Sequence, residues 1–303
     1  MGDDAPLLYD VRHVTRYAYE DAVAMSQHLL HLQPLSNSWQ HCHHHRIEVT
    51  PSSDETWIGV DFFGNRTVVV NVNHAHDEFC VDSRSSVTVE PRPRLAALAR
   101  SPQWESVAQM LQEMRDFDGE DPRRFLYESP HVDLIGALGT FAAPSFAPGR
   151  PLLEACHDLM GRIRAGFAFD PRATDVSTPV YEVLRLRRGV CQDFAHLMIG
   201  CLRSLGLAAR YVSGYIHTRR LDSDGEMTGA DASHAWVSAW CPRHGWVDFD
   251  PTNDLLVDRE HVTVAIGRDF GDVSPVRGVV LGGAGDPKVG VTVRRRVVES
   301  AGP

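Results

Sequence analysis

The sequence lacks the features that mark secreted and membrane-spanning chains. Its six cysteines, at positions 42, 80, 156, 191, 201 and 241, form no CxxC pair and no regular framework. We therefore expect free thiols, as in a reducing cytoplasm. The acidic first residues, 1–6, contain no apolar signal core, and no apolar run approaches the roughly 18 residues that span a membrane. These absences predict a cytoplasmic protein with no membrane partner.

Positive charge is scarce as well. Lys and Arg number 30 against 40 Asp and Glu, which gives a formal net charge of −10. With no long basic patch, this balance argues against a nucleic-acid partner, and we attribute the charge to solubility. An apolar content of 43% is ordinary for a soluble globular protein. A length of 303 residues favours two domains over one.

Two loops lack the residues that a cofactor would require. Residues 282–285, Gly-Gly-Ala-Gly, are not followed by the Lys-Ser/Thr pair and the helix of a phosphate-binding loop. Residues 222–226 resemble half of a calcium loop, but the later glutamate ligand is missing. We therefore predict no cofactor and no obligatory metal.

One histidine-rich stretch, residues 41–45, resembles a metal site. On a strand, His41, His43 and His45 would line one face, which suits metal ligands. Side chains two residues apart on a strand lie about 7 Å from one another, so they rarely converge on one ion unaided. We favour a solvated polar strand here and leave metal binding by this stretch open.

A long apolar helix is predicted to begin at Cys191. Apolar residues recur after it at helical spacing and cover most of the circumference, which predicts a buried helix: Phe194, Ala195, Leu197, Met198, Ile199, Cys201, Leu202 and Leu205. The unpaired N–H groups and the dipole at the start of a helix favour an anion such as a thiolate. Taken alone, Cys191 is still more readily interpreted as a small buried hydrophobe.

A β-hairpin downstream supplies a base and an acid. Residues 233–240 and 246–250 alternate in the manner of strands, and residues 241–245 between them contain Pro and Gly, which predicts a five-residue loop. With a loop of odd length, even-numbered residues oppose one another, so His234, Trp236 and Asp250 share one face. With Cys191, this arrangement provides a nucleophile, a base and a carboxylate that orients the base.

Neighbouring residues offer alternatives. Gln192 is a candidate for binding the oxyanion, although the backbone N–H groups at the start of the helix would serve without it. Asp193 is expected to complement the helix N-terminus rather than to act as an acid. His196 competes as a base but has no evident orienting acid. Trp236 is equally well interpreted as a wall of the acyl pocket or as core filling.

These motifs resemble the transglutaminase-like superfamily, and within it the bacterial branch that carries an N-terminal β domain. The resemblance covers the core from about residue 151 to residue 253, with weaker matches outside it; the matching blocks are residues 189–196, 209–215, 234–237 and 245–253, with 12–17, 26–30 and 261–269. By this resemblance the nucleophile is Cys191, the base is His234 and the acid is Asp250. It implies a papain-like α+β core, in which a buried helix carrying the cysteine packs on an antiparallel sheet.

The chain is expected to contain three parts. Residues 1–90 show several short β patterns separated by turns, which predict an N-terminal sandwich-like β domain. Residues 91–150, interrupted by prolines, predict an ordered helical linker. Residues 151–303 are assigned to the catalytic domain, with strands at 262–266 and 289–297 and a glycine-rich loop from 267 to 287 beside the active-site cleft.

The expected activity is thiol-dependent acyl transfer on an amide or peptide bond of a peptide or protein substrate, ending most readily in hydrolysis. Protein cross-linking and a non-catalytic binding module on the same fold are the alternatives. A zinc-dependent amidase built on the histidine-rich stretch ranks last. Neither the substrate nor the oligomeric state is predicted.

Overall fold

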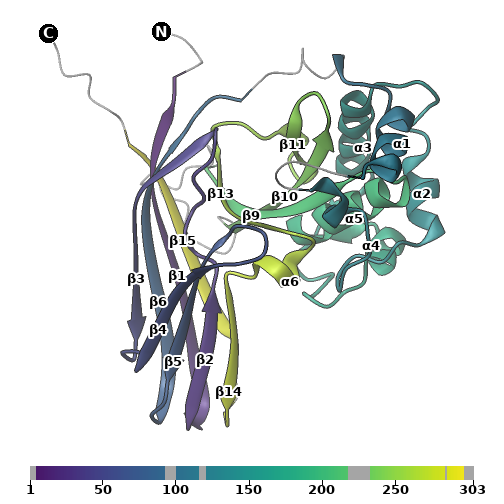
Figure 1. The fold of residues 1–303 in the computed structure, drawn as a ribbon. Coiled ribbons are helices and arrows are strands. Elements are labelled where there is room, and N and C mark those ends of the chain that lie inside the picture. Colours follow the sequence, from purple (N-terminus) through teal and green to yellow (C-terminus); the bar gives the residue numbers. More distant parts are fainter. Residues whose placement is uncertain (1–4, 93–99, 116–120, 218–232, 284, 297–303) are drawn as a thin grey trace, which may run out of the picture.

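The computed structural model describes residues 5–92, 100–115, 121–217, 233–283 and 285–296. The half-calcium-loop pattern at residues 222–226 lies outside this range. The fold is α+β, as expected, with a β sandwich beside a further sheet that is covered by helices (Figure 1). No described helix is both long and apolar enough to cross a membrane.

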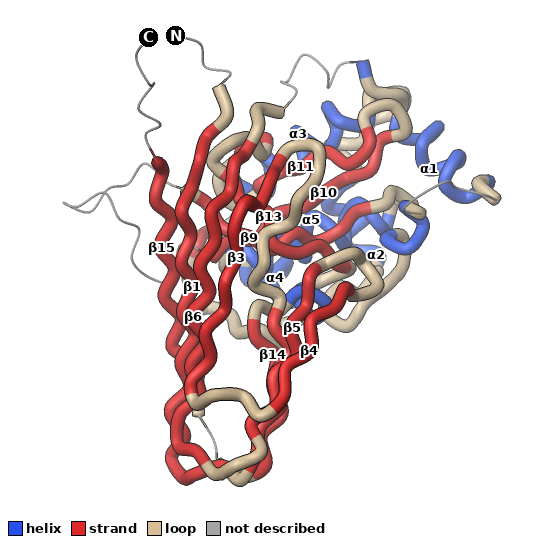
Figure 2. Tube along the Cα trace, turned by 60° about the vertical axis from the view of Figure 1, so that its left-hand side comes forward, coloured by secondary structure: helices blue, strands red, loops and turns tan. Residues whose placement is uncertain are grey.

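Two four-stranded antiparallel sheets form the sandwich (Figure 2). Apolar side chains from both sheets fill the space between them, among them Leu30, Val72, Phe79 and Val81. The first sheet has the order β15-β1-β6-β3 and the second β14-β2-β5-β4. Their bounds are Leu7–Val23 for β1, Met25–Leu30 for β2, Gln40–Thr50 for β3, Glu55–Val60 for β4, Arg66–Val72 for β5, His76–Val89 for β6, Val276–Leu281 for β14 and Pro287–Arg296 for β15.

The last strands of the chain complete this N-terminal sandwich. Strand β15 pairs with β1 from Leu8↔Arg296 to Tyr17↔Pro287, and β14 pairs with β2. The expected loop at 267–287 is therefore wrong, because this stretch contains the short helix α6 (Phe270–Val273) and β14. The glycines of this stretch led to the prediction of a loop, although its β-branched residues Val276, Val279 and Val280 favour a strand. The domain boundaries near residues 90 and 150 stay predictions.

The second half is built on a five-stranded sheet of order β12-β11-β10-β9-β13. Helix α5 (Cys191–Ser204) packs on this sheet, and helices α2, α3 and α4 pack against α5 (Figure 1). The remaining bounds are Trp104–Glu113 for α1, Pro122–Phe125 for η2, Gly136–Ala142 for α2, Leu152–Gly166 for α3, Ala168–Phe169 for β7, Val180–Leu186 for α4, Arg188–Gly189 for β8, Ala209–Ile216 for β9, Ser233–Cys241 for β10, Gly245–Asp250 for β11, Leu255–Leu256 for β12 and His261–Gly267 for β13.

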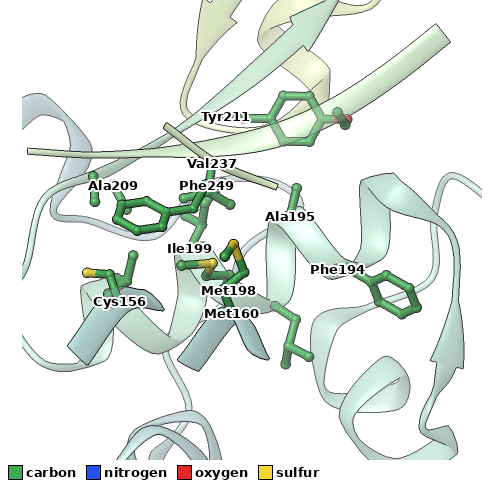
Figure 3. Close-up of a cluster of buried hydrophobic side chains, with 14 of the residues drawn as sticks. Cys156, Met160, Phe194, Ala195, Met198, Ile199, Ala209, Tyr211, Val237 and Phe249 are labelled. Atoms are coloured by element: carbon green, nitrogen blue, oxygen red, sulfur yellow. The ribbon is translucent and has the colours of Figure 1, made fainter. Parts of the chain in front are cut away.

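The predicted buried helix is confirmed as α5, which lies at the centre of this half. From Asp193 to Arg203 every residue of it is buried. Figure 3 shows Met198 and Ile199 of this helix among Met160 of α3 and Val237 and Phe249 of the sheet. A helix packed on both sides cannot move without disrupting the core, so its first residue, Cys191, is held in a fixed place.

Two amide side chains of the sandwich bind the edge strand β13. Gln40 donates to the carbonyl of Thr263 at 2.8 Å and accepts from its N–H at 2.7 Å. Asn65 forms the same pair with Ile266, at 2.7 and 2.8 Å. These bonds satisfy backbone groups that an edge strand leaves open, and they fix β13 against the sandwich.

Candidate active site

The start of α5 is shaped by Asp193, as the sequence predicted. Its Oδ2 accepts hydrogen bonds from the backbone N–H of Val190 and from Thr174 Oγ1, each at 2.7 Å. A Cβ at Gly189 would lie 2.5 Å from that same Oδ2. The carboxylate therefore requires the glycine and caps the helix, while Cys191 is left partly exposed as the first helical residue.

The hairpin has the predicted register. Trp240 opposes Trp246 and Ser238 opposes Asp248, so even-numbered residues face one another. The loop is shorter than expected, because Cys241 also pairs with Gly245 and leaves residues 242–244 as the turn. Shortening by two residues preserves the parity, and His234, Trp236 and Asp250 therefore share one face as predicted.

This register brings His234 to Asp250. The distance from His234 Nε2 to Asp250 Oδ2 is 2.7 Å, and both side chains are buried. Oδ1 of Asp250 accepts from the backbone N–H groups of Thr252 and Asn253, at 3.0 and 3.2 Å. The Asn253 side chain also donates to Oδ2 at 2.7 Å. The turn after β11 therefore holds the carboxylate from behind.

A second histidine, which the sequence analysis did not single out, binds the same carboxylate. His261, the first residue of β13, places Nε2 3.2 Å from Asp250 Oδ2. It reaches the site because β13 pairs with β9, which in turn pairs with β10. No local pattern encodes the strand order β10-β9-β13, so the parity of the hairpin alone could not have placed His261.

Burial and charge act in opposite directions on the His234–Asp250 pair. Burial alone would lower the pKa of His234, but the Asp250 carboxylate and hydrogen bonds with Asp250 and Cys191 raise it to about 10. Burial would raise the pKa of Asp250, whereas His234 and His261 hold it well below its usual range. An imidazolium beside an ionised carboxylate is therefore the favoured state at neutral pH.

The ring of His234 also lies near the thiol, because Cys191 helps to raise the pKa of His234. Its Nε2 is used by Asp250, which leaves Nδ1 as the nitrogen available to Cys191. The structure thus brings together Cys191, His234 and Asp250 from α5, β10 and β11.

Two of the alternative residues are engaged elsewhere. The Gln192 side chain donates to the carbonyl of Val176 at 3.3 Å. His196 is buried, accepts the N–H of Phe270 at Nε2 over 3.1 Å, and stacks on His131. Burial lowers the pKa of His196 to about 3, so this ring is a poor candidate for the base.

Trp236 is fully buried beside the rings of His234 and His261. Its ring packs with Val212, Val257 and Ile266. It also lies edge-on to the ring of His261, with 5.3 Å between the two ring centroids. Its Nε1 donates to Asp248 Oδ2 at 3.4 Å. Of the two predicted roles, these contacts support core filling, in a position that backs the histidine rings.

The histidine-rich stretch forms part of β3, and the expected alignment holds for His41 and His43, whose ring centroids lie 4.6 Å apart, but not for His45. A bulge between Cys42 and His44 interrupts the alternation. As a result His43 Nε2 bonds Thr88 Oγ1 at 2.7 Å and His45 Nδ1 bonds Ser85 Oγ at 2.9 Å. Because those partners lie three positions apart on β6, they point to opposite faces of the sheet.

Within the described part of the chain, the one group of three possible metal-ligand atoms belongs to His234, Asp250 and His261. Both imidazoles already direct Nε2 at Asp250 Oδ2, at 2.7 and 3.2 Å. Hydrogen bonding therefore accounts for this cluster, and we do not assign it to a metal.

Known proteins share both halves of the chain. Residues 9–88 match the bacterial transglutaminase-like N-terminal region, and residues 140–251 match the transglutaminase-like superfamily core. An uncharacterized protein of Mycobacterium tuberculosis is 38% identical over 292 residues, which cover 94% of this chain and 91% of that protein. A Pseudomonas aeruginosa protein-glutamine gamma-glutamyltransferase is 35% identical over 81 residues, 24% of this chain and 11% of that protein.

The fold has a counterpart among solved structures. The crystal structure of a "Putative Cysteine Protease" from Cytophaga hutchinsonii superposes with a TM-score of 0.73 at 21% identity, covering 99% of this chain and 93% of that one. This likeness shows a shared fold over both halves. With the two sequence matches and the full-length relative, it establishes that the chain belongs to the transglutaminase-like superfamily, in the bacterial branch with an N-terminal β region.

Proposed function

We propose that the protein transfers the acyl group of an amide or peptide bond through a thioester on Cys191. The 2.7 Å hydrogen bond between His234 and Asp250, on a ring whose pKa Cys191 also helps to raise, is the observation that carries this proposal. A histidine held in this way can accept the thiol proton and later release it, while the carboxylate stabilises the imidazolium.

Each step uses a group already described. The Cys191 sulfur attacks the carbonyl carbon, and His234 holds the proton that the thiol gives up. The backbone N–H groups of Cys191 and Gln192, at the start of α5, lack partners within the helix and are suited to stabilise the oxyanion. When the C–N bond breaks, His234 gives its proton to the leaving amine.

Release of the acyl group decides between the two enzymatic alternatives. Water gives hydrolysis and a free acid, whereas a primary amine gives a new amide and thus cross-linking. We favour hydrolysis of a peptide or protein substrate. Turnover in the presence of an added labelled amine distinguishes the two, because only transfer incorporates the label into the product.

Two further features of the proposal concern the setting of the protein. The cysteines are free thiols in the structure, and Cys191 must stay reduced to react. We therefore place the activity in the cytoplasm. We propose no nucleic-acid partner, because the net charge of −10 would repel a phosphate backbone.

Replacing the nucleophile tests the proposal. Cys191→Ala should fold normally and lose at least about a thousandfold in turnover of mixed peptide amides, because the thioester cannot form. Cys201→Ala is the matched control: Cys201 lies on the same helix, and burial raises the pKa of its thiol to about 12. Loss of activity in both variants, or in neither, would contradict the role of Cys191.

A binding module on the same fold is the rival from another class. It predicts that iodoacetamide at pH 6 alkylates Cys191 no faster than the other cysteines. Faster alkylation of Cys191 than of the other cysteines in the wild-type protein favours an enzyme over a binding module.

A further inference from the structure

We propose that His261 is a positioning residue for the reaction. It shares one oxygen of Asp250 with His234 and so limits how strongly that carboxylate holds the catalytic imidazolium. This inference rests on the proposed function, since it assigns a role within the same proton transfer.

The hydrogen bonds on Asp250 show that Oδ2 is shared. Three N–H donors converge on Oδ2: His234 Nε2 at 2.7 Å, His261 Nε2 at 3.2 Å and Asn253 Nδ2 at 2.7 Å. Two backbone N–H groups occupy Oδ1. A carboxylate with five donors is fixed as the ionised form. Both imidazoles must therefore donate through Nε2, which leaves Nδ1 of His234 to exchange a proton with Cys191.

The ring of His261 is directed at Asp250 and is otherwise enclosed. The side chain is 2% exposed, and its Nδ1 is buried with no hydrogen-bond partner among the described residues. The bond from Nε2 to Asp250 Oδ2, at 3.2 Å, is therefore the hydrogen bond that this ring forms within that part of the chain.

Among the residues that the structure describes, few ionisable or charged groups face these rings from the packed strands. Asp250 of β11 and the His234 ring of β10, 6.1 Å away between centroids, face His261. Trp236 lies edge-on at 5.3 Å. His234 additionally meets Cys191 of α5. The hydrogen bonding of both imidazoles therefore depends on the one carboxylate that they share.

Strand β13 is built to hold this ring in place. The backbone N–H of His261 donates to the carbonyl of Asp258 at 3.1 Å, and its backbone pairs with Ile216 of β9. Thr263 lies two residues after His261 on β13. The Gln40 side chain of the sandwich forms hydrogen bonds with both its backbone N–H and its carbonyl. The N-terminal domain thereby contributes to the geometry of the site, through β13.

The chemical consequence follows from hydrogen bonding. A carboxylate oxygen that accepts fewer N–H groups is a stronger base, and it binds the imidazolium of His234 more tightly. An imidazolium that is bound too tightly is a weaker acid toward the leaving amine. By sharing Oδ2, His261 keeps the proton of His234 available.

The test measures alkylation of Cys191 by iodoacetate across pH, with modification of that cysteine followed by mass spectrometry. Iodoacetate is an anion, so its reaction rate should fall when the imidazolium of His234 loses its proton. In His261→Phe, which removes the donor but keeps a ring, this descending limb should move upward by about half a pH unit or more. Turnover should fall by about tenfold with KM within about twofold of wild type.

His261→Gln supplies the rescue, because its amide N–H can reach the same oxygen. It should return the descending limb and the turnover close to wild-type values. The inference would be overturned if the descending limb of His261→Phe stayed at its wild-type pH or moved to lower pH. It would also be overturned if His261→Gln behaved like His261→Phe. Thermal unfolding of each variant identifies a loss of turnover that comes only from misfolding. Such a loss would leave the pH of the descending limb unchanged for the protein that remains folded.

A failure of the proposed function has a different signature. Wild-type protein would then show no bell-shaped reactivity at Cys191 at all, whatever residue occupies position 261.

Discussion

Two carboxylates organise the site at the scale of single residues. Asp193 caps the helix that carries Cys191, and Asp250 orients the ring that faces the thiol. Each is held by several donors and each restricts its neighbours, Asp193 through the space it takes from Gly189 and Asp250 through the oxygen it shares with His261. The proposed chemistry at Cys191 therefore depends on groups that act through their neighbours.

Gly189→Ala tests the restriction imposed by Asp193. The added methyl group would lie 2.5 Å from Asp193 Oδ2, so the carboxylate must move and its bond to Val190 must break. We expect a loss of roughly 1–3 kcal/mol in the free energy of unfolding together with reduced turnover, measured by urea denaturation and by amide hydrolysis.

Gly166→Ala is the control for this substitution. Gly166 ends helix α3 and has open space around its Cα, with nothing within 4 Å of an added Cβ. Alanine there should leave stability unchanged or raise it by up to about 1 kcal/mol. Equal losses in the two variants would show that Asp193 does not explain the glycine at 189.

At the scale of secondary-structure elements, local patterns predicted more than long-range pairings. The apolar spacing after Cys191 and the parity of the hairpin are properties of neighbouring residues, and both α5 and the β10–β11 register agree with them. The pairing of β15 with β1 joins opposite ends of the chain, and no local pattern encodes it. The place of His261 was missed for the same reason, since it depends on the order of β10, β9 and β13 in the sheet.

A buried charge on β15 tests its place in the sandwich. Val293 is 0% exposed and opposes Val11 of β1. Val293→Asp should lower the free energy of unfolding by about 3 kcal/mol or more, because an unpaired carboxylate would be buried. Val279→Asp on β14, at a position 75% exposed, should change it by less than about 0.5 kcal/mol. Similar effects of both, in urea unfolding of the whole chain, would argue against the observed pairing.

Buried histidines couple the stability of the whole molecule to pH. Burial lowers the pKa of His13, His28 and His45 to about 4. The unfolded chain binds protons at these residues near pH 6.5, whereas the folded protein binds them only near pH 4. Stability should therefore be fully present above pH 6.5 and fall as the pH is lowered toward 4.

His28 offers the clearest test of this coupling. Its ring stacks on Phe79 at 3.6 Å between centroids, and both of its nitrogens are buried without a partner among the described residues. His28→Phe should reduce the loss of stability between pH 7 and pH 4 by roughly 3 kcal/mol, measured by chemical denaturation at a series of pH values. An unchanged slope would mean that protonation of His28 does not oppose folding.

The thioester is the step that every other part of the mechanism serves. Protein quenched in acid during turnover of a mixed peptide amide, then digested and analysed by mass spectrometry, should carry the acyl mass on the peptide that contains Cys191. The same experiment on a His234→Ala variant should show no acyl mass. Turnover with no adduct on Cys191, or with the adduct on another residue, would contradict the account.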